Sequence, residues 1–248
     1  MADRFGDKVV LVTGASSGLG AACARLMAGQ GAQVYAVARD EARLAEVVAH
    51  GDGRIAAHRA DLADPAACAG AVAACVEQFG RLDVLVNNAG RHDFRITTDV
   101  SIEQWQRDIA VNLNSTFFLS QAALPHLIET RGNIVNVASV AGVSGEAYSA
   151  AYTAAKHGVV GLTKALAVEY LHSPVRINCV CPGGMETPQV TTIDIPDGAD
   201  WELIMRVSAA RGFMQPEQVA EVVAFLASEQ ASAVHGSIQT VDAGHTAG

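Results

Sequence analysis

A tyrosine and a lysine stand four residues apart in AYTAAKHG, residues 151–158, where most of the other side chains are small. On a helix this spacing places Tyr152 and Lys156 on one face, with their Cβ atoms roughly 5–6 Å apart. Lowering a phenol pKa from about 10 to about 7 takes about 4 kcal/mol. An ammonium ion at ~4 Å supplies about that much at an effective dielectric constant of ~20. The spacing therefore predicts a phenol of lowered pKa that transfers protons; a solvated helix surface is the alternative.

A glycine-rich turn follows the first expected strand, in the sequence TGASSGLG at residues 13–20. Between a strand and a helix, such a turn lets backbone N–H groups approach a phosphate at the helix N-terminus, where the helix dipole favours negative charge. The spacing G-x-x-x-G-x-G differs from the common dinucleotide fingerprint and lacks the Gly-Lys-Ser/Thr of a P-loop. The turn predicts a pyrophosphate cradle, with an ordinary tight turn as the alternative.

The end of the second strand in a dinucleotide-binding fold contacts the adenosine ribose. An acidic residue there binds the 2′-hydroxyl of NAD, whereas a basic residue accommodates the 2′-phosphate of NADP. Here Ala38 ends the expected strand and Arg39 follows it. Asp40 opens the next helix, and we interpret it as an N-cap. The sequence thus favours NADP(H) as cofactor, with NAD(H) as the alternative.

Short β-branched runs alternate with helical patterns along the chain and must position these residues. One expected helix opens at Ser101, which forms a capping box with Gln104; others span about 152–171 and 216–228. One face of the first helix is marked by Ile102, Trp105, Ile109, Leu113 and Phe117. The expected strands are VVLVT from Val9, VYAVA from Val34, IAAHR from Ile55, VLVN from Val84, IVNVA from Ile134, RINCV from Arg176 and SIQTV from Ser237.

Sustained strand–helix alternation predicts an α/β doubly wound domain with a parallel sheet. No linker or repeat divides the chain, so we expect a single domain over residues 1–248. Residues 186–215 are too long for a tight connection and are expected to form a substrate lid. Apolar residues in that segment predict a partly apolar alcohol or carbonyl substrate, and the alternative is that they pack on the domain body. These residues are Ile193, Ile195, Trp201, Leu203, Ile204, Met205, Val207, Phe213 and Met214.

The composition of the chain limits the kinds of molecule that it is expected to bind. The chain has 248 residues, 50% of them hydrophobic, and a formal net charge of −9 without a basic cluster, which argues against binding to nucleic acid or to an anionic membrane. No signal peptide or apolar run of about 18 residues is present, so a soluble, cytoplasmic protein is expected. Five cysteines without metal-site spacing are expected to be buried in a reducing cytosol, with no metal bound: Cys23, Cys68, Cys75, Cys179 and Cys181.

Six motifs in register make the chain resemble the short-chain dehydrogenase/reductase family over essentially its whole length. They are TGASSGLG at 13–20, NNAG at 87–90, Asn112, Ser139, Tyr152 with Lys156, and PGGMET at 182–187. The resemblance implies a single Rossmann-type domain with a seven-stranded parallel sheet flanked by helices, assembled as a homotetramer or homodimer. It also implies an oxidoreductase that interconverts a secondary alcohol and a carbonyl with a nicotinamide cofactor.

By this resemblance, Tyr152 exchanges a proton with the substrate oxygen, and Ser139 hydrogen-bonds and polarises that oxygen. Lys156 lowers the Tyr152 pKa, together with the charge of the oxidised nicotinamide, and holds the nicotinamide ribose. Asn112 anchors a water that links Lys156 to solvent. The cofactor-binding residues implied are Gly14, Ser16, Ser17, Gly18, Leu19, Gly20, Arg39, Asp61, Leu62, Asn88, Ala89, Gly90, Tyr152, Lys156, Pro182, Gly183 and Thr187.

Each of these positions also has a structural interpretation, since Ser139 can end a strand, Asn112 can bridge backbone and NNAG can be an ordinary turn. Asn87 is expected to be structural, and Arg91 and His92 are candidates for substrate contact. The family's usual Asp-Gly-Gly near the C-terminus is Asp242-Ala243-Gly244 here, a departure that concerns subunit packing. Besides an alcohol dehydrogenase or carbonyl reductase, two functions stay open: a 3-oxoacyl-thioester reductase and a non-catalytic nucleotide sensor or scaffold.

Overall fold

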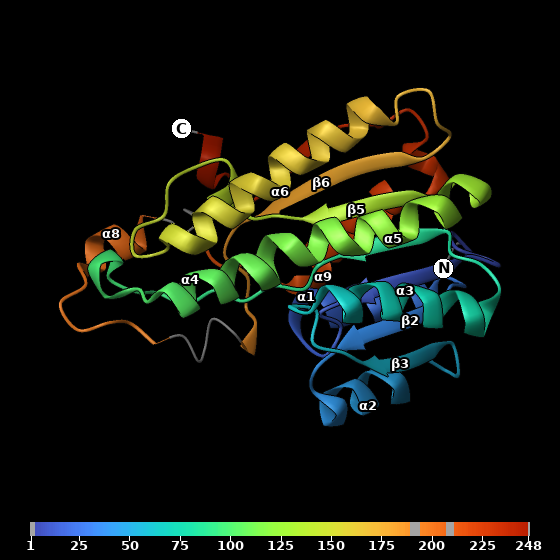
Figure 1. Cartoon of the computed structure of the whole chain (residues 1–248), viewed down its shortest axis with the longest axis horizontal. Coiled ribbons are helices and arrows are strands. Elements are labelled where there is room, and N and C mark those ends of the chain that lie inside the picture. The colour runs from blue at the N-terminus through green and yellow to red at the C-terminus, as the bar shows by residue number, and fades with distance from the viewer. Residues whose placement is uncertain (1–2, 189–193, 207–210, 248) are drawn as a thin grey trace.

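Seven parallel strands form one sheet through the middle of the computed structural model, which describes residues 3–188, 194–206 and 211–247 (Figure 1). The strand order β3-β2-β1-β4-β5-β6-β7 confirms the Rossmann-type doubly wound fold. The strands are β1 Val9–Thr13, β2 Gln33–Ala38, β3 Ile55–Arg59, β4 Val84–Asn87, β5 Asn133–Val137, β6 Arg176–Pro182 and β7 Ile238–Val241.

Helices cover both faces of this sheet. In Figure 1, α3, α5 and α6 lie in front of the strands, and α1 and α9 lie behind them. The longer helices are α1 Gly18–Gly29, α2 Glu41–Ala49, α3 Pro65–Phe79, α4 Ile102–Ile109, α5 Ser115–Thr130, α6 Ala150–Glu169, α8 Trp201–Met205 and α9 Pro216–Ala227. A π-helical segment, η2 Ala110–Asn114, joins α4 to α5, and short 3₁₀ helices are η1 Thr97–Asp99, η3 Val140–Gly142, η4 Glu229–Ala231 and η5 His245–Ala247.

Alternating side chains of the strands build two cores. Val10 and Val12 of β1 pack towards α1 and α9, whereas Val9 and Leu11 of the same strand pack towards α3 and α5. Because both faces of a parallel sheet are covered, its strands are apolar throughout, which is why β-branched runs located them in the sequence. All five cysteines are buried, as expected.

Polar caps set the helix starts. Asp40 accepts a hydrogen bond from the Arg43 amide and caps α2, which confirms its interpretation as an N-cap. Ser101 and Gln104 form the expected capping box at the start of α4. The apolar residues expected on one face of that helix are not all core residues, because Ile102 is 71% and Trp105 is 42% exposed.

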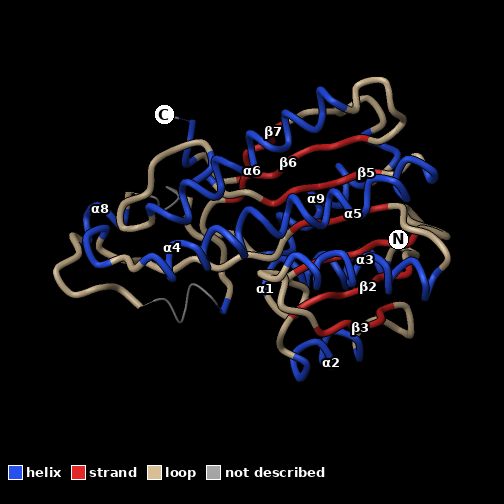
Figure 2. Tube along the Cα trace, viewed as in Figure 1, coloured by secondary structure: helices blue, strands red, loops and turns tan. Residues whose placement is uncertain are grey.

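The parallel strands all end at the same edge of the sheet. Figure 2 shows the loops that follow these strands gathered at the left, together with α4 and α8. Strand β1 pairs with β2 on one side and with β4 on the other, so the chain reverses its winding direction between β1 and β4. In open α/β sheets, ligands bind in the crevice at such a switch point.

The long connection from β6 to α9 contains α8 and is closed at its base. Met185 and Met214 form an isolated parallel bridge, and the Glu186 amide donates to the Met214 carbonyl at 2.9 Å. Ile204 and Met214 are buried, whereas Trp201 and Phe213 are exposed. Two apolar residues expected in this segment, Ile193 and Val207, lie outside the described residues. No helix in the described part of the chain is both long and apolar enough to span a membrane.

Candidate active site

Two turns at the switch point are tied together by one hydroxyl. Thr13 ends β1, and its Oγ1 accepts hydrogen bonds from the amides of Asn88 at 2.9 Å and Ala89 at 3.0 Å. The Asn88 side chain returns the contact by donating to the Thr13 carbonyl at 3.0 Å. The glycine-rich turn after β1 and the NNAG turn after β4 are therefore held side by side at the crevice.

The glycines of the first turn leave room for a ligand and for the neighbouring backbone. Gly14 has φ +64°, and a Cβ there would lie 2.9 Å from the Cα of Ala89. A Cβ on Gly20 would lie 2.3 Å from the Gly14 carbonyl oxygen, so only glycine allows α1 to start this close to the turn. This bare backbone beside a helix N-terminus fits the diphosphate of a dinucleotide.

Two adjoining clefts open along these turns and share Gly14, Ser17 and Gly90. The smaller cleft has a volume of about 180 Å³ and the larger one about 570 Å³. The smaller is lined by Gly14, Ser17, Gly18, Leu19, Asn88, Gly90, Arg91, Val137, Ala138, Ser139, Tyr152, Lys156, Pro182, Gly183, Met185 and Thr187. The larger is lined by Gly14, Ser16, Ser17, Ala38, Arg39, Asp40, Arg43, Ala60, Asp61, Leu62, Ala89, Gly90 and Val111.

These linings bring together nearly every cofactor residue that the sequence implied. Gly20 is the exception, because it packs beneath the turn and lines neither cleft. Sequence reasoning did not assign Arg43, Val111 or Met185 to the cofactor. Arg43 had a signal, since it lies four residues beyond Arg39, and so had Met185, which lies within the PGGMET motif. Nothing in the sequence marked Val111.

The tyrosine and lysine that the sequence marks as candidates for proton transfer both line the smaller cleft. Tyr152, in the first turn of α6, forms a hydrogen bond with Ser139, which follows β5 and caps η3. The Lys156 ammonium lies 5.6 Å from the centre of the Tyr152 ring and donates to the Val137 carbonyl at 2.9 Å. The helix spacing thus brings the two side chains close together, and the end of β5 supplies their polar partners.

Asn112 is fully buried within the π-helical segment, and its side chain binds the backbone of the loop after β4. Its Oδ1 accepts from the Arg91 amide at 2.9 Å, and its Nδ2 donates to the carbonyls of Arg91 and Asp108. A Cβ on Gly90 would lie 2.8 Å from that Oδ1 and 3.4 Å from the Lys156 Nζ. Gly90 therefore allows Asn112 and Lys156 to converge behind the cleft. π-Helical turns often occur at functional sites.

The pKa of the Tyr152 phenol depends on its burial and on its charged and polar neighbours. Burial raises the pKa of its phenol, the charge of Glu146 raises it further, and the hydrogen bond from Ser139 opposes both. Burial also lowers the Lys156 pKa to about 8. The Tyr152 pKa of the chain by itself is therefore raised, because the loss of hydration disfavours the phenolate, and the lowering expected from Lys156 together with an oxidised nicotinamide stays a prediction.

The larger cleft has basic and acidic side chains at its far end. Arg39 follows β2, and Asp40 forms an ion pair with Arg43 at 3.4 Å. Asp61 pairs with Arg107 of α4 at 2.8 Å. Burial acts to raise the Asp61 pKa, but hydrogen bonds from Arg107 and the Ala63 amide outweigh it, so the pKa is lowered and the carboxylate is ionised at neutral pH.

Asn87 faces away from both clefts. Its side-chain amide donates to Ser120 at 3.1 Å and to Asn136 at 2.9 Å within the buried layer between sheet and helices. These contacts are structural, as expected. No group of three or more metal-ligating side chains gathers anywhere in the part of the chain that the structure describes.

Comparison with known proteins identifies the family to which this chain belongs. The model of the family described as short chain dehydrogenase matches residues 8–196. The chain is 41% identical over 252 residues to the cyclohexanol dehydrogenase of Acinetobacter sp. (strain SE19), covering 99% of this chain and 98% of that one. It is 40% identical to the meso-2,3-butanediol dehydrogenase of Serratia marcescens, covering 98% and 96%. Levodione reductase has a similar solved structure, with a TM-score of 0.90 at 33% identity, covering 98% and 99%.

Proposed function

This chain belongs to the short-chain dehydrogenase family, and on that premise we propose that it interconverts a secondary alcohol and a carbonyl with Tyr152 as general acid/base. The observation that supports this most directly is the hydroxyl of the half-buried Tyr152, hydrogen-bonded to Ser139 in a cleft that also contains Lys156. A phenol, a hydroxyl and an ammonium at the end of a dinucleotide-binding crevice suit proton transfer to or from a substrate oxygen.

A nicotinamide dinucleotide supplies or accepts the hydride when it is bound. The glycine turn and the first turn of α1 would hold its diphosphate, and the NNAG turn would pack against it. Lys156 would hold the nicotinamide ribose, with Pro182, Gly183 and Thr187 lining the same cleft. Asp61 and Leu62 would flank the adenine in the larger cleft.

During reduction, Tyr152 gives its phenolic proton to the carbonyl oxygen while Ser139 donates a hydrogen bond to that oxygen. During oxidation, the phenolate takes the hydroxyl proton of the alcohol. Because burial and Glu146 raise the Tyr152 pKa, the phenolate requires nearby positive charge, which Lys156 and an oxidised nicotinamide provide. Asn112 fixes the loop behind Lys156, and a water anchored there would return the proton to solvent.

Substitution of Tyr152 by phenylalanine tests this assignment. We expect Tyr152→Phe to lower kcat for ketone reduction by about 10²–10⁴-fold, because the general acid is lost, while dinucleotide affinity stays near that of the parent. Tyr35→Phe, on the distant strand β2, is the matched control. A parent protein that binds NADPH or NADH but reduces none of a panel of ketones would instead be a nucleotide sensor.

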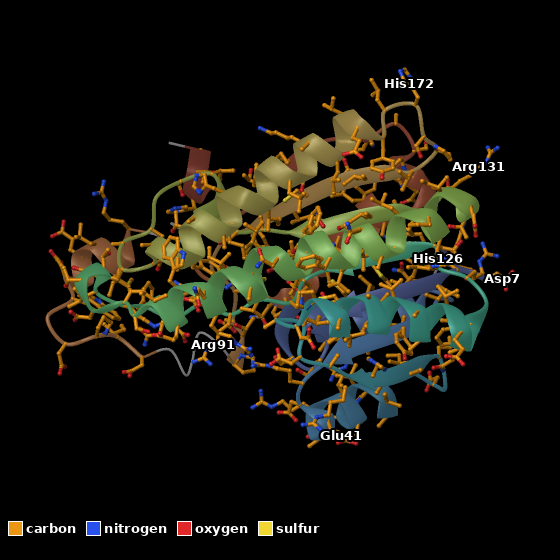
Figure 3. All side chains as sticks on the ribbon, viewed as in Figure 1. Asp7, Glu41, Arg91, His126, Arg131 and His172 are labelled. Atoms are coloured by element: carbon orange, nitrogen blue, oxygen red, sulfur yellow. The ribbon has the colours of Figure 1, made fainter. Side chains whose placement is uncertain are left out.

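The cofactor is proposed to be NADP(H) in preference to NAD(H). Arg39 lines the cleft directly after β2, where a 2′-phosphate would lie, and Asp40 is engaged in capping α2 and pairing with Arg43. Arg39→Gln should weaken NADPH binding about tenfold or more and leave NADH binding little changed, as measured by fluorescence titration. The control is Arg131→Gln, at the end of the sheet where the strands begin, far from Arg39 (Figure 3). An equal loss for both dinucleotides would contradict the preference.

The substrate is proposed to be partly apolar and to be covered by residues 186–215, as the lid of a single domain that spans residues 1–248. Met185 lines the catalytic cleft, and its bridge to Met214 places the base of the segment beside that cleft. The names of the two dehydrogenases above specify a cyclic alcohol and a short diol. A screen in which only charged sugars or polyols of many hydroxyl groups turned over would reject an apolar substrate.

Self-association is proposed to occur through the outer face of α5 and α6. A groove of about 380 Å³ runs between these helices and is lined by Phe117, Leu124 and Ile128 on one side and by Leu166 and Tyr170 on the other. Among the described residues that line this groove, Glu169 is the one charged residue, so little charge must be desolvated when the groove is covered. A second copy of the chain, turned about a two-fold axis, presents the same apolar surface in return.

A further inference from the structure

A histidine ring lies almost flat on the phenol of Tyr152. His92 is the second residue after the NNAG turn, and its ring centre lies 4.4 Å from that of Tyr152 at an interplanar angle of 28°. Phe94 meets the same imidazole edge-on at 4.6 Å. Contact on two sides gives the imidazole a defined place, and stacked rings restrict each other's rotation.

Ser149 holds the other end of this imidazole. Its buried Oγ lies 2.7 Å from His92 Nε2 and 3.2 Å from the Ala147 carbonyl, to which the hydroxyl can donate. We therefore assign the Nε2–H tautomer to His92, which then donates to Ser149. Burial lowers the His92 pKa to about 4, so the ring is neutral at physiological pH. Ser149 directly precedes α6, so this contact joins the loop after β4 to the helix that carries Tyr152.

Glu146 places a carboxylate beside the same stack. Its Oε1 lies 3.9 Å from His92 Nε2, and its side chain is only 10% exposed. Burial raises the Glu146 pKa to about 7, and after burial of the phenol itself this carboxylate is the next cause of the raised Tyr152 pKa. Glu146 therefore changes charge near neutral pH, within the electrostatic reach of the phenol.

Other charged groups around the stack are already paired or belong to the catalytic cleft. Asp93, on the loop after β4, and Asp108, on α4, both form ion pairs with Arg95. Lys156 approaches from α6 and the Cys181 thiol from β6. In the described part of the chain, the basic side chain beside the Glu146 carboxylate is His92 at 3.9 Å, and it is neutral at physiological pH. The contact between Glu146 and His92 is therefore not an ion pair at that pH, and it does not keep the carboxylate charged.

We propose that His92 and Glu146 are positioning residues for Tyr152: the imidazole fixes the direction of the phenol, and the carboxylate sets the pH range in which the phenol gives up its proton. This inference rests on the proposed role of Tyr152 as general acid/base. It concerns two side chains that do not line either cleft and that act through the tyrosine.

The stacking part is tested by paired substitutions of His92. We expect His92→Leu to lower kcat about tenfold, since an aromatic pair contributes this order of stabilisation, with dinucleotide affinity unchanged. His92→Phe retains a flat ring and should recover most of that loss. Ser149→Ala keeps the stacked imidazole but frees its end, so it should lower kcat less than His92→Leu does. His172→Leu, at the opposite end of the molecule, is the control (Figure 3). A leucine variant with parental kcat, or a phenylalanine variant as slow as leucine, overturns this part.

The charge part is tested with Glu146→Gln, which keeps the size of the side chain. In the parent, the resonance of Tyr152 in ¹³Cζ-tyrosine-labelled protein, assigned by its loss in Tyr152→Phe, should shift in a step near pH 7 as Glu146 ionises. That step should vanish in Glu146→Gln. The pH at which alcohol oxidation rises should also move downward, because removing an anion makes the phenol easier to ionise. A step that persists, or an unmoved pH profile, overturns this part.

The proposed function and the positioning role of His92 and Glu146 can be disproved separately. If the parent turns over no alcohol or ketone, the proposed function fails, yet the Tyr152 resonance still reports whether Glu146 and His92 face the phenol. If the parent is active and Tyr152→Phe is not, but the His92 and Glu146 variants behave like the parent in both assays, the positioning inference fails alone.

Discussion

Lys156 is only 3% exposed, and its ammonium group donates a hydrogen bond to the Val137 carbonyl. Such burial disfavours the charged form, which is why the Lys156 pKa lies near 8. The residue proposed to support proton transfer is therefore also a source of instability. Catalytic groups are commonly kept in such strained electrostatic surroundings.

Removing that charge should stabilise the protein in a pH-dependent manner. The folded-state pKa of about 8 lies below the usual 10.5, so between these values the unfolded chain binds more protons and stability rises with pH. The cost is fully present below pH 8. Lys156→Met should thus be more stable than the parent at pH 7, by at most about 3 kcal/mol, with the advantage shrinking towards pH 10.

Urea unfolding at several pH values measures this difference. Lys164→Met, an exposed lysine on the same helix, should show no pH-dependent gain. An advantage of Lys156→Met that grew with pH would contradict the assigned direction of the pKa.

Residue spacing in the sequence was enough to predict that Tyr152 and Lys156 lie together, since α6 is a regular helix. It could not give the direction of the Tyr152 pKa, because burial depends on side chains from β5, β6 and the loop after β4. His92 was a candidate for substrate contact, and the structure instead stacks it on Tyr152. Glu146 had no signal, since an acidic residue in a loop is normally solvated.

At the scale of elements, the junction of β1 and α1 depends on the absence of one side chain. Gly20→Ala would drive a Cβ to within 2.3 Å of the Gly14 carbonyl oxygen, so the glycine turn must move. We expect a loss of about 1–3 kcal/mol in stability and dinucleotide binding too weak to detect by fluorescence titration.

Gly29 on the same helix is a matched control. A Cβ there has nothing within 4 Å, so Gly29→Ala should leave binding unchanged and stabilise the helix by up to about 1 kcal/mol. Equal behaviour of the two variants would show that close approach at residue 20 does not shape the cradle.

The strands were the most predictable elements, because two-sided burial makes them continuous β-branched runs. Their ends moved little: β5 begins one residue early, at Asn133, and β6 runs on to Pro182. The π-helical segment was not predictable, since the sequence AVNLN has no feature that separates it from an ordinary helix. The expected apolar face is exposed on both sides of this segment, at Ile102 and Trp105 before it and at Phe117 after it.

For the whole molecule, the α5–α6 surface makes self-association testable. Phe117 and Ile128 line the apolar groove and are 39% and 37% exposed. Ile128→Glu should raise the dissociation constant of the assembly by about 10–100-fold, since a two-fold interface uses each side chain twice. Light scattering across a dilution series measures this. Ala73→Glu on α3 is the control, and a parent that is monomeric at micromolar concentration would contradict the proposal.

The pairing of β1 with β4 places Val10 beside Val84, although the two residues lie far apart in the sequence. The crevice between those strands takes its walls from the first turn of the chain, the middle of it and the segment after β6. Contacts of such long range form slowly, because loop-closure entropy opposes them. Catalytic turnover therefore requires the complete native fold. A nascent or clipped polypeptide in which only the first half is folded has only half of the crevice, and we expect activity to appear only once the last strands are in place.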